Sequence, residues 1–362
     1  MRRKQIVCGL TVMFFLIALP ARAQQEVRIL TWNLEWFFDH DTSDDDSNIG
    51  RDFAAPSAQE FRDRVATIAD AIATIQPTIV ALQEIENALV VQALATELLQ
   101  RHSLAYTVAF VQGRDTHTGQ DVAFLVDSTL PFTVERFDFS EFAGEPDFKD
   151  LSKHLRMDVT IAGEPVTLVT VHLITQLSQR LRQARTLRAW TQELVPARNL
   201  IILGDFNSGL RVNETTNDSE MGIIRGFGTS STDDDLFDAH LNLTNRDTHV
   251  SGRELDRILL SPSLTDTAGL HLTSIERRRD LAIRGAVDGL EAVAYELPVD
   301  QQDLSDHFPL IATLTATNMA PPPPPAISRA DLLEAMQRLE SELQRLANEV
   351  NALRVLVEQI PE

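Results

Sequence analysis

Short runs of apolar residues recur from residue 26 to about residue 317 and alternate with segments of helical periodicity. Runs rich in Val, Ile and Leu predict β-strands, whereas apolar residues three and four apart predict amphipathic helices. The expected helices cover residues 60–75, 88–101 and 178–194. The expected strands cover residues 27–34, 79–82, 105–111, 121–126, 166–173, 200–203, 257–260 and 310–314. Such a mixture over roughly 290 residues indicates a layered α/β or α+β domain.

The first 23 residues differ in composition from the rest of the chain. Basic residues at positions 2–4 precede an apolar run over residues 6–19, which is shorter than the ~20 residues that a membrane-spanning helix needs. The sequence Ala-Arg-Ala follows at residues 21–23. This order is typical of a secretory signal peptide, with an uncleaved anchor as the alternative. We therefore expect a secreted or periplasmic protein without a membrane anchor after cleavage.

Charge and cysteine content exclude several function classes. The formal net charge is −21, so the protein as a whole does not attract polyanions, and passive coating of nucleic acid is disfavoured. An enzyme that recruits divalent cations is compatible with this charge, because a bound cation reverses the local field. Cys8, inside the expected signal peptide, is the only cysteine. The mature chain would therefore lack disulfides, a thiol nucleophile and cysteine ligands for zinc.

The C-terminal region has a pattern of its own. Five consecutive prolines within residues 319–327 predict a stiff polyproline II linker. From Leu332 to Ile360, within residues 328–362, apolar residues recur at alternating spacings of four and three. This heptad pattern predicts a coiled coil that joins two or three chains into a homo-oligomer, with a single helix packed on the domain as the alternative. The folded domain is then expected to cover residues 24–318.

Short polar signatures lie at the ends of predicted strands, where layered sheets commonly place functional sites. A carboxylate directly after an apolar run, as at Glu84, is costly unless a cation binds it. Asp205 and Asn207 are two residues apart and project to the same side of an extended chain. The six signatures are Thr-Trp-Asn ending at Asn33, Leu-Gln-Glu-Ile around Glu84, Val-His-Leu around His172, Gly-Asp-Phe-Asn at 204–207, Leu-Asp-Arg around Asp256 and Ser-Asp-His at 305–307.

Together and in this order, the signatures resemble those of the endonuclease/exonuclease/phosphatase superfamily. That group includes pancreatic-type deoxyribonucleases, abasic-site endonucleases, neutral sphingomyelinases and inositol polyphosphate 5-phosphatases. The resemblance covers about residues 26–316, and Gly-Asp-Phe-Asn and Ser-Asp-His are its most specific segments. It implies an α+β fold, a four-layer α/β/β/α sandwich of two mixed β-sheets with outer helices. The active site would lie at one edge of that sandwich.

The resemblance also implies roles for individual residues. It implies metal binding by Asn33, Glu84 and Asp306, and catalysis by His172, Asp205, Asn207, Asp256 and His307. Glu84 would be the principal ligand, and Asp256 would fix the tautomer of His307. Hard oxygen ligands favour Mg²⁺ or Mn²⁺, with Ca²⁺ as a candidate second ion. Whether Asp205 or His307 is the general base stays open at this point.

The phosphate-contacting residue of the family has no unique counterpart in this sequence. The segment 149–156 offers Lys149, Lys153 and Arg156, and we expect Lys153 and Arg156 to bind substrate. The expected function is a divalent-metal-dependent phosphodiesterase, an endonuclease-like hydrolase of extracellular nucleic acid. One alternative is a phosphatase or a sphingomyelinase-like phospholipid phosphodiesterase, for which the four phenylalanines within residues 137–148 would contact lipid. Another is a non-catalytic oligomeric surface protein.

Overall fold

The computed structural model describes residues 25–43, 55–196, 198–208, 219–267, 269–284 and 297–317. The expected signal peptide, proline-rich linker and coiled coil lie outside these residues, so those three predictions stay predictions. Within the described ranges, no helix combines the length and the apolar character that crossing a membrane requires.

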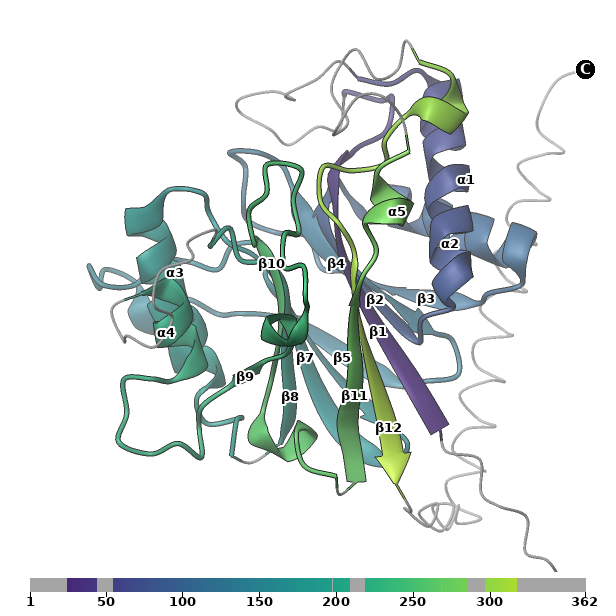
Figure 1. Cartoon of the computed structure of the whole chain (residues 1–362). Coiled ribbons are helices and arrows are strands. Elements are labelled where there is room, and N and C mark those ends of the chain that lie inside the picture. The colour runs from purple at the N-terminus through teal and green to yellow at the C-terminus, as the bar shows by residue number, and fades with distance from the viewer. Residues whose placement is uncertain are drawn as a thin grey trace, which may run out of the picture.

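Two six-stranded mixed sheets pack face to face and carry helices on their outer faces (Figure 1). The first sheet has the strand order β11-β12-β1-β2-β4-β3, and the second has the order β5-β6-β7-β8-β10-β9. The strands are β1 (Gln25–Phe37), β2 (Ile79–Ile85), β3 (Tyr106–Ala109), β4 (Asp121–Asp127), β5 (Phe132–Arg136), β6 (Leu155–Ile161), β7 (Glu164–His172), β8 (Asn199–Asp205), β9 (Phe237–Asp238), β10 (Asp256–Leu260), β11 (Gly269–Arg277) and β12 (Leu310–Thr317). The helices are α1 (Ala58–Ile75), α2 (Ala88–His102), α3 (Leu177–Thr191), α4 (Glu220–Arg225) and α5 (Arg279–Ala282). The predicted sandwich of two mixed sheets with outer helices is confirmed.

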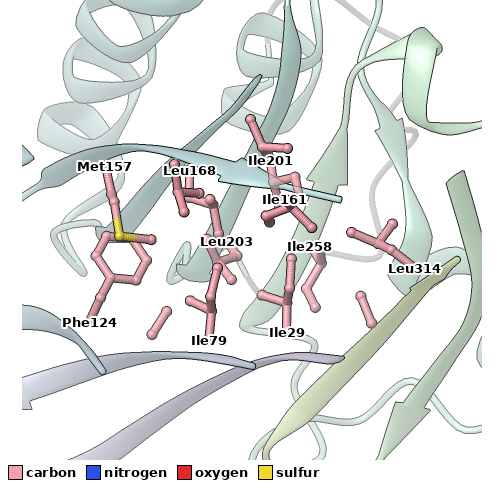
Figure 2. Close-up of a cluster of buried hydrophobic side chains, with 14 of the residues drawn as sticks. Ile29, Ile79, Phe124, Met157, Ile161, Leu168, Ile201, Leu203, Ile258 and Leu314 are labelled. Carbon is pink, nitrogen blue, oxygen red and sulfur yellow. The ribbon is translucent and has the colours of Figure 1, made fainter. Parts of the chain in front are cut away.

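The two sheets bury a common core because successive side chains of a strand point to opposite faces. In β1, Ile29 lies in the core between the sheets, whereas Leu30 packs on the side of α1 and α2. Figure 2 shows Ile29 and Ile79 of the first sheet facing Leu203 and Ile258 of the second. All of these side chains are fully buried, so truncating one of them to alanine would cost about 2–5 kcal/mol of stability.

The helices cover the outer faces as their apolar spacing predicts. α1 begins at a capping box in which Ser57 accepts the N–H of Glu60 and the Glu60 side chain accepts the N–H of Ser57. α3 and α4 cover the second sheet, where Leu187 and Ile224 pack in one cluster with Val171. All three helices expected from the sequence are present, although α3 ends at Thr191 and not at residue 194.

Strands β5, β6, β9 and β11 were not expected from the sequence. β6 alternates buried Leu155 and Met157 with half-buried Arg156 and Asp158, so it lacks the continuous apolar run of the central strands. The edge strands β5 and β11 likewise have one face that is not fully buried. A half-solvated antiparallel strand carries a weaker apolar signal than a strand buried on both faces.

Candidate active site

Strand ends from both sheets deliver polar side chains to one edge of the sandwich. β1 runs parallel to β2, and β7 runs parallel to β8, so the carboxyl ends within each pair lie side by side. The first pair carries Asn33 and Glu84, and the second carries His172 and Asp205, which are register partners. β10 begins beside β8 with Asp256 opposite Asp205. Strand pairing thus brings two of the predicted site residues together in the first sheet and three in the second, and the packing of the two sheets places the two groups at one edge.

The backbone is strained at this edge. The φ angle is 59° at Glu84, 48° at Asn207 and 46° at Glu35, in the left-handed region that residues with a side chain rarely adopt. Glu84 lies where the register of β2 with β4 shifts, between Gln83 and Ile85. A bulge of this kind re-aims the side chain that it carries. Strain of this kind persists only where the surrounding structure holds it, and it is characteristic of functional sites.

Arg64 of α1 helps to hold this strained backbone in place. Its buried guanidinium donates to the backbone carbonyls of Leu34, Glu35 and Trp36 at 2.5, 2.8 and 3.1 Å. It also donates to the carbonyl of Leu304 at 3.3 Å. One side chain thus ties the end of β1 to the segment that precedes Ser-Asp-His.

A cavity of about 960 Å³ opens at this edge. This volume is within the range of about 300–1,000 Å³ that is usual for sites that bind small molecules or groups. Its lining includes Glu84, His172, Asp205, Asn207 and His307, and also Arg114, Gln120, Lys149, Lys153, His249 and Arg253.

The Glu84 carboxylate, the predicted principal metal ligand, accepts three hydrogen bonds. Its Oε1 accepts from Nδ2 of Asn33 at 3.0 Å, and its Oε2 accepts from the backbone N–H of Trp36 at 2.9 Å and from Nε2 of Gln120 at 2.7 Å. Burial raises the pKa of Glu84, and the nearby carboxylate of Asp306 raises it further. A cation that both carboxylates can approach would offset this repulsion.

Asn33 joins two carboxylates of the site. Its Nδ2 donates to Oε1 of Glu84 at 3.0 Å and to Oδ2 of Asp205 at 3.1 Å, whereas its Oδ1 accepts the backbone N–H of Glu35 at 2.9 Å. The amide oxygen, which is the atom that a metal ligand would use, is thus engaged with the backbone here. The structure brings Asn33 to the metal-ligand cluster, and the ligand role itself stays a prediction.

His307 is held between two carboxylates. Its Nδ1 lies 2.8 Å from Oδ2 of Asp256, and its Nε2 lies 3.8 Å from Oδ2 of Asp205. Burial lowers the pKa of His307, but the charges of Asp256 and Asp205 outweigh burial and raise it well above its usual value. Burial also raises the pKa of Asp205, while the positive charge of His307 lowers it, and the pKa of Asp205 stays above its usual range. The geometry therefore favours a cationic imidazole next to a carboxylate that binds a proton more readily than an exposed aspartate does.

His172 lies on the other side of Asp205. Its Nε2 is 3.6 Å from Oδ2 of Asp205 and 3.6 Å from Oε1 of Glu84. Burial lowers the pKa of His172, and the positive charge of Lys153 lowers it further, so this imidazole is neutral. The two predicted catalytic histidines therefore differ in charge. Nδ1 of His307 is bonded to the carboxylate of Asp256, whereas Nδ1 of His172 has no such bond to any described residue.

The donor atoms around the cavity fit a divalent cation. Atoms of Glu84, His172 and Asp205 lie within 4.8 Å of one another. Oδ1 of Asp306 is buried and has no hydrogen-bond partner among the residues that the structure describes. Glu84 and Asp306 would bind the ion directly, and Asp205 and His172 would lie next to it. A divalent cation bound there neutralises charge on a phosphoryl oxygen and on the departing alkoxide.

The two predicted substrate-binding residues have different positions. Lys153 lines the cavity, where its Nζ lies 2.8 Å from Oδ2 of Asp115. Arg156 lies on β6, where its guanidinium pairs with Glu135 at 3.0 Å and with Asp158 at 2.7 Å. It does not belong to the cavity lining. The structure therefore does not bring Arg156 to the site. Lys149 and Lys153 precede β6 and line the cavity, whereas Arg156 lies on the strand itself and pairs with side chains of β5 and β6.

Sequence reasoning missed Gln120 and His249. Gln120 precedes β4 and donates to Glu84, and His249 bonds to Asp306 at 2.9 Å. Gln120 is separated by Asp121 from the apolar run 122–126, so it does not share the position directly after an apolar run that identified Glu84. His249 lies in a loop without periodicity, and only the fold places it next to the Ser-Asp-His segment.

Comparison with known proteins gives the same fold. The model of the Endonuclease/Exonuclease/phosphatase family matches residues 30–307. A D. rerio TDP2 humanised by 14 mutations aligns with a TM-score of 0.51 and 19% identity, over 80% of this chain and 98% of that one. Truncated Caenorhabditis elegans TDP2 aligns at 0.50 with 18% identity, over 80% of this chain and 98% of that one. A Bacteroides thetaiotaomicron protein described as endonuclease/exonuclease/phosphatase family aligns at 0.50 with 16% identity, over 82% and 99%. No curated protein matches the sequence.

Proposed function

The chain belongs to the endonuclease/exonuclease/phosphatase family of divalent-metal-dependent phosphoesterases, and we propose that it is a secreted phosphodiesterase that cleaves nucleic acid. The observation that carries this proposal is the arrangement of Asp205 between His172 and His307, beside Glu84 in one cavity. A phosphodiester is anionic and repels nucleophiles, so its hydrolysis needs a base for water together with positive charge at the phosphoryl oxygens.

The charges in the site favour one assignment of the base. Asp205 has a raised pKa because of burial, which makes its carboxylate a better proton acceptor than an exposed aspartate. His307 is kept protonated by Asp256, so its Nε2–H is a donor and not a base. In the proposed reaction Asp205 takes the proton from the attacking water. His307 donates a hydrogen bond to the phosphoryl oxygen on which charge develops.

Asn207 positions Asp205 for this role. Its backbone N–H donates to Oδ1 of Asp205 at 2.7 Å, and its side-chain Nδ2 donates to the carbonyl of Leu173 at 2.8 Å. Both contacts fix the turn that follows β8. The second oxygen of Asp205 then remains directed toward the two histidines.

The cavity walls support a polyanionic substrate despite the acidic composition of the whole chain. Lys149, Lys153, Arg114 and Arg253 line the cavity. The lining also holds the carboxylates of Glu84, Asp115, Asp150 and Asp205, so these cations offer individual contacts to phosphates at short range and do not make the cavity basic as a whole. Two of the four cations, Arg114 and Lys153, pair with Asp150 and Asp115 and so also shape the wall.

The phenylalanine-rich segment gives no support to a lipid substrate. Phe137, Phe142 and Phe148 pack on one another, and Phe137 also packs on Trp190 of α3 with ring centroids 5.1 Å apart. Phe137 is buried in the core cluster of α3, α4 and the second sheet, and Phe142 packs half-buried against that cluster. A membrane-inserting hairpin would instead expose its aromatic side chains.

A side-by-side assay with Mg²⁺ tests the substrate. Plasmid DNA, RNA, a bis-aryl phosphodiester, an aryl phosphomonoester and sphingomyelin vesicles are offered to the purified protein. The proposal expects cleavage of nucleic acid and of the small diester, with little action on the other two. Faster turnover of the monoester or of sphingomyelin would contradict it.

Secretion and oligomerisation belong to the same proposal and rest on the sequence alone. The signal-like residues 1–23 should be absent from the N-terminus of the protein recovered from its host, which N-terminal sequencing measures. Residues 328–362 should assemble two or three chains, so that several sites act on one polymer. Light scattering that finds a monomer at micromolar concentration would contradict the coiled coil, and turnover of a small diester should not depend on it.

A further inference from the structure

The loop that precedes β10 is attached to the Ser-Asp-His segment by its backbone. The N–H of Val250 donates to the carbonyl of Asp306 at 2.9 Å, and the N–H of Phe308 donates to the carbonyl of Thr248 at 2.7 Å. His249 and His307 are therefore paired across an isolated antiparallel bridge. Their rings meet edge to face with centroids 4.7 Å apart.

The same loop also fixes the partner of His307. The buried hydroxyl of Thr248 accepts the backbone N–H groups of Leu255 and Asp256, both at 2.9 Å. The loop of residues 248–256 thus contacts both carboxylates: Thr248 holds the backbone of Asp256, and the neighbouring His249 contacts Asp306. The side chain that makes the contact with Asp306 is His249, whose Nε2 lies 2.9 Å from Oδ2 of that carboxylate.

The surroundings of His249 determine which ring nitrogen carries the proton. Its Nδ1 accepts the backbone N–H of Ser251 at 3.0 Å and lies 2.8 Å from Oγ of Ser251, so the Nδ1 lone pair is engaged and this nitrogen carries no proton. The proton of the neutral ring therefore lies on Nε2 and is donated to Asp306. Nε2 is then a donor and not a metal ligand, even though His249, Asp306 and His307 lie close enough together to suggest a three-residue metal cluster.

This bond has a consequence for the other oxygen of Asp306. Oδ2 is engaged with His249, and the backbone N–H of Asp306 donates to Oε2 of Glu35 at 3.0 Å. Oδ1 is left buried, 3.8 Å from Nε2 of His307, and it has no hydrogen-bond partner in the described part of the chain. Asp306 is thus held at its backbone N–H and at Oδ2, which leaves Oδ1 as the carboxylate oxygen that can bind a cation.

We propose that His249 is a positioning residue that orients Asp306 so that Oδ1 of this carboxylate is presented to the divalent cation. The inference rests on the proposed function, since it assigns a partner to one ligand of that cation. Carboxylate ligands are commonly fixed by such outer hydrogen bonds, and loss of the partner typically weakens metal affinity or activity by about 10–100-fold.

A matched pair of variants tests this role. His249→Gln places an amide N–H near the position of Nε2, whereas His249→Asn is one methylene shorter and cannot reach Asp306. The control is His102→Asn, because His102 makes the same contact with Asp70, at 2.8 Å, on the far helices α1 and α2. The whole chain is used, and Mn²⁺ affinity is measured by electron paramagnetic resonance without substrate. kcat and KM for a bis-aryl phosphodiester are measured separately.

The expected result for His249→Asn is Mn²⁺ binding at least ~10-fold weaker than in the native protein, with a lower kcat at limiting metal and an unchanged KM. His249→Gln should bind Mn²⁺ within about threefold of the native protein, and His102→Asn should match the native protein. The proposal is overturned if His249→Asn binds Mn²⁺ as tightly as His102→Asn does, or if His249→Gln is as defective as His249→Asn. The variant Glu84→Gln distinguishes failure of this inference from failure of the proposed function. If that variant is inactive and His249→Asn is normal, only the inference fails, whereas an active Glu84→Gln would refute the proposed function.

Discussion

Nδ1 of His307 lies 2.8 Å from Oδ2 of Asp256, and both side chains are buried. The two residues are 51 positions apart, and they meet because the segment before β12 crosses the start of β10. The contact keeps the imidazole cationic and directs Nε2 toward Asp205. The positive charge on His307 therefore depends on its contact with Asp256.

Because the pair acts as a unit, its two substitutions should not be additive. Asp256→Asn and His307→Ala should each lower kcat by at least ~10²-fold, the usual scale for a positioned acid–base group. The double variant should be little worse than His307→Ala, since the second change removes an interaction already lost. Steady-state kinetics on a small phosphodiester measures all three. Full additivity would show that Asp256 acts independently of His307.

Glu84→Gln should abolish hydrolysis. The variant keeps the size of the side chain but removes the charge that a divalent cation requires, and one amide hydrogen of the new glutamine would face the donor of Gln120 or Asn33. Mn²⁺ binding should be lost together with turnover, while the thermal midpoint should change little. Treatment of the native protein with excess EDTA should have the same effect on activity, and full activity in EDTA would contradict a metal-dependent mechanism.

Gly204→Ala should damage both the fold and the site. The φ angle of Gly204 is 130°, and a Cβ atom built there would lie 2.2 Å from the backbone carbonyl oxygen of Val171. Since that oxygen belongs to the paired strand β7, relief requires β7 and β8 to separate where they carry His172 and Asp205. We expect a loss of several kcal/mol in the free energy of unfolding, on the order of other strained core substitutions, and a lower kcat. Gly252→Ala is the control, because its Cβ would meet nothing within 4 Å although its φ is also positive.

Acid should destabilise the protein through His154. This side chain is fully buried, and neither ring nitrogen has a hydrogen-bond partner within the described ranges. Burial, helped by the charge of Lys153, lowers the pKa of His154 to about 3. The unfolded chain binds this proton near pH 6.5, so the stability due to neutral His154 is complete above that pH and is lost as the pH falls toward 3.

Urea unfolding at pH 7, 6, 5 and 4 checks this. The loss per pH unit from a single such group is at most about 1.4 kcal/mol, and other groups titrate in the same window. His154→Leu should therefore have a shallower decline in the free energy of unfolding below pH 6.5 than the native protein. Parallel curves for the two proteins would show that His154 does not bind a proton on unfolding.

The sequence was most informative where strands are buried on both faces. The apolar runs before Glu84 and Asp205 predicted both the strands and the polar residues that end them, because a carboxylate in that position needs a special reason. Those predictions agree with β2 and β8. The half-buried strand β6 was missed, and with it the fact that Arg156 faces Glu135 and Asp158 and not the cavity.

Contacts between loops were beyond the reach of the sequence. His249 has no periodic neighbours that mark it, and its contact with Asp306 depends on an isolated bridge between segments 57 residues apart. Likewise, the residues next to His172 and His307 in the sequence do not show that the first is neutral and the second cationic. The difference in pKa comes from the charged side chains that surround each ring in the fold. The family resemblance thus brought together the residues at strand ends, whereas the loop contacts and the protonation of the histidines required the three-dimensional arrangement.

β1 is bordered by β2 and by β12, the last strand of the domain, and Thr31 pairs with Leu310. A growing chain that has not reached residue 310 therefore leaves β1 as an open sheet edge and does not yet hold His307 in place. Pairing between segments so distant in sequence delays folding until synthesis is nearly complete. An unfinished chain on the ribosome therefore has no assembled site, and the site forms only after β12 has been made.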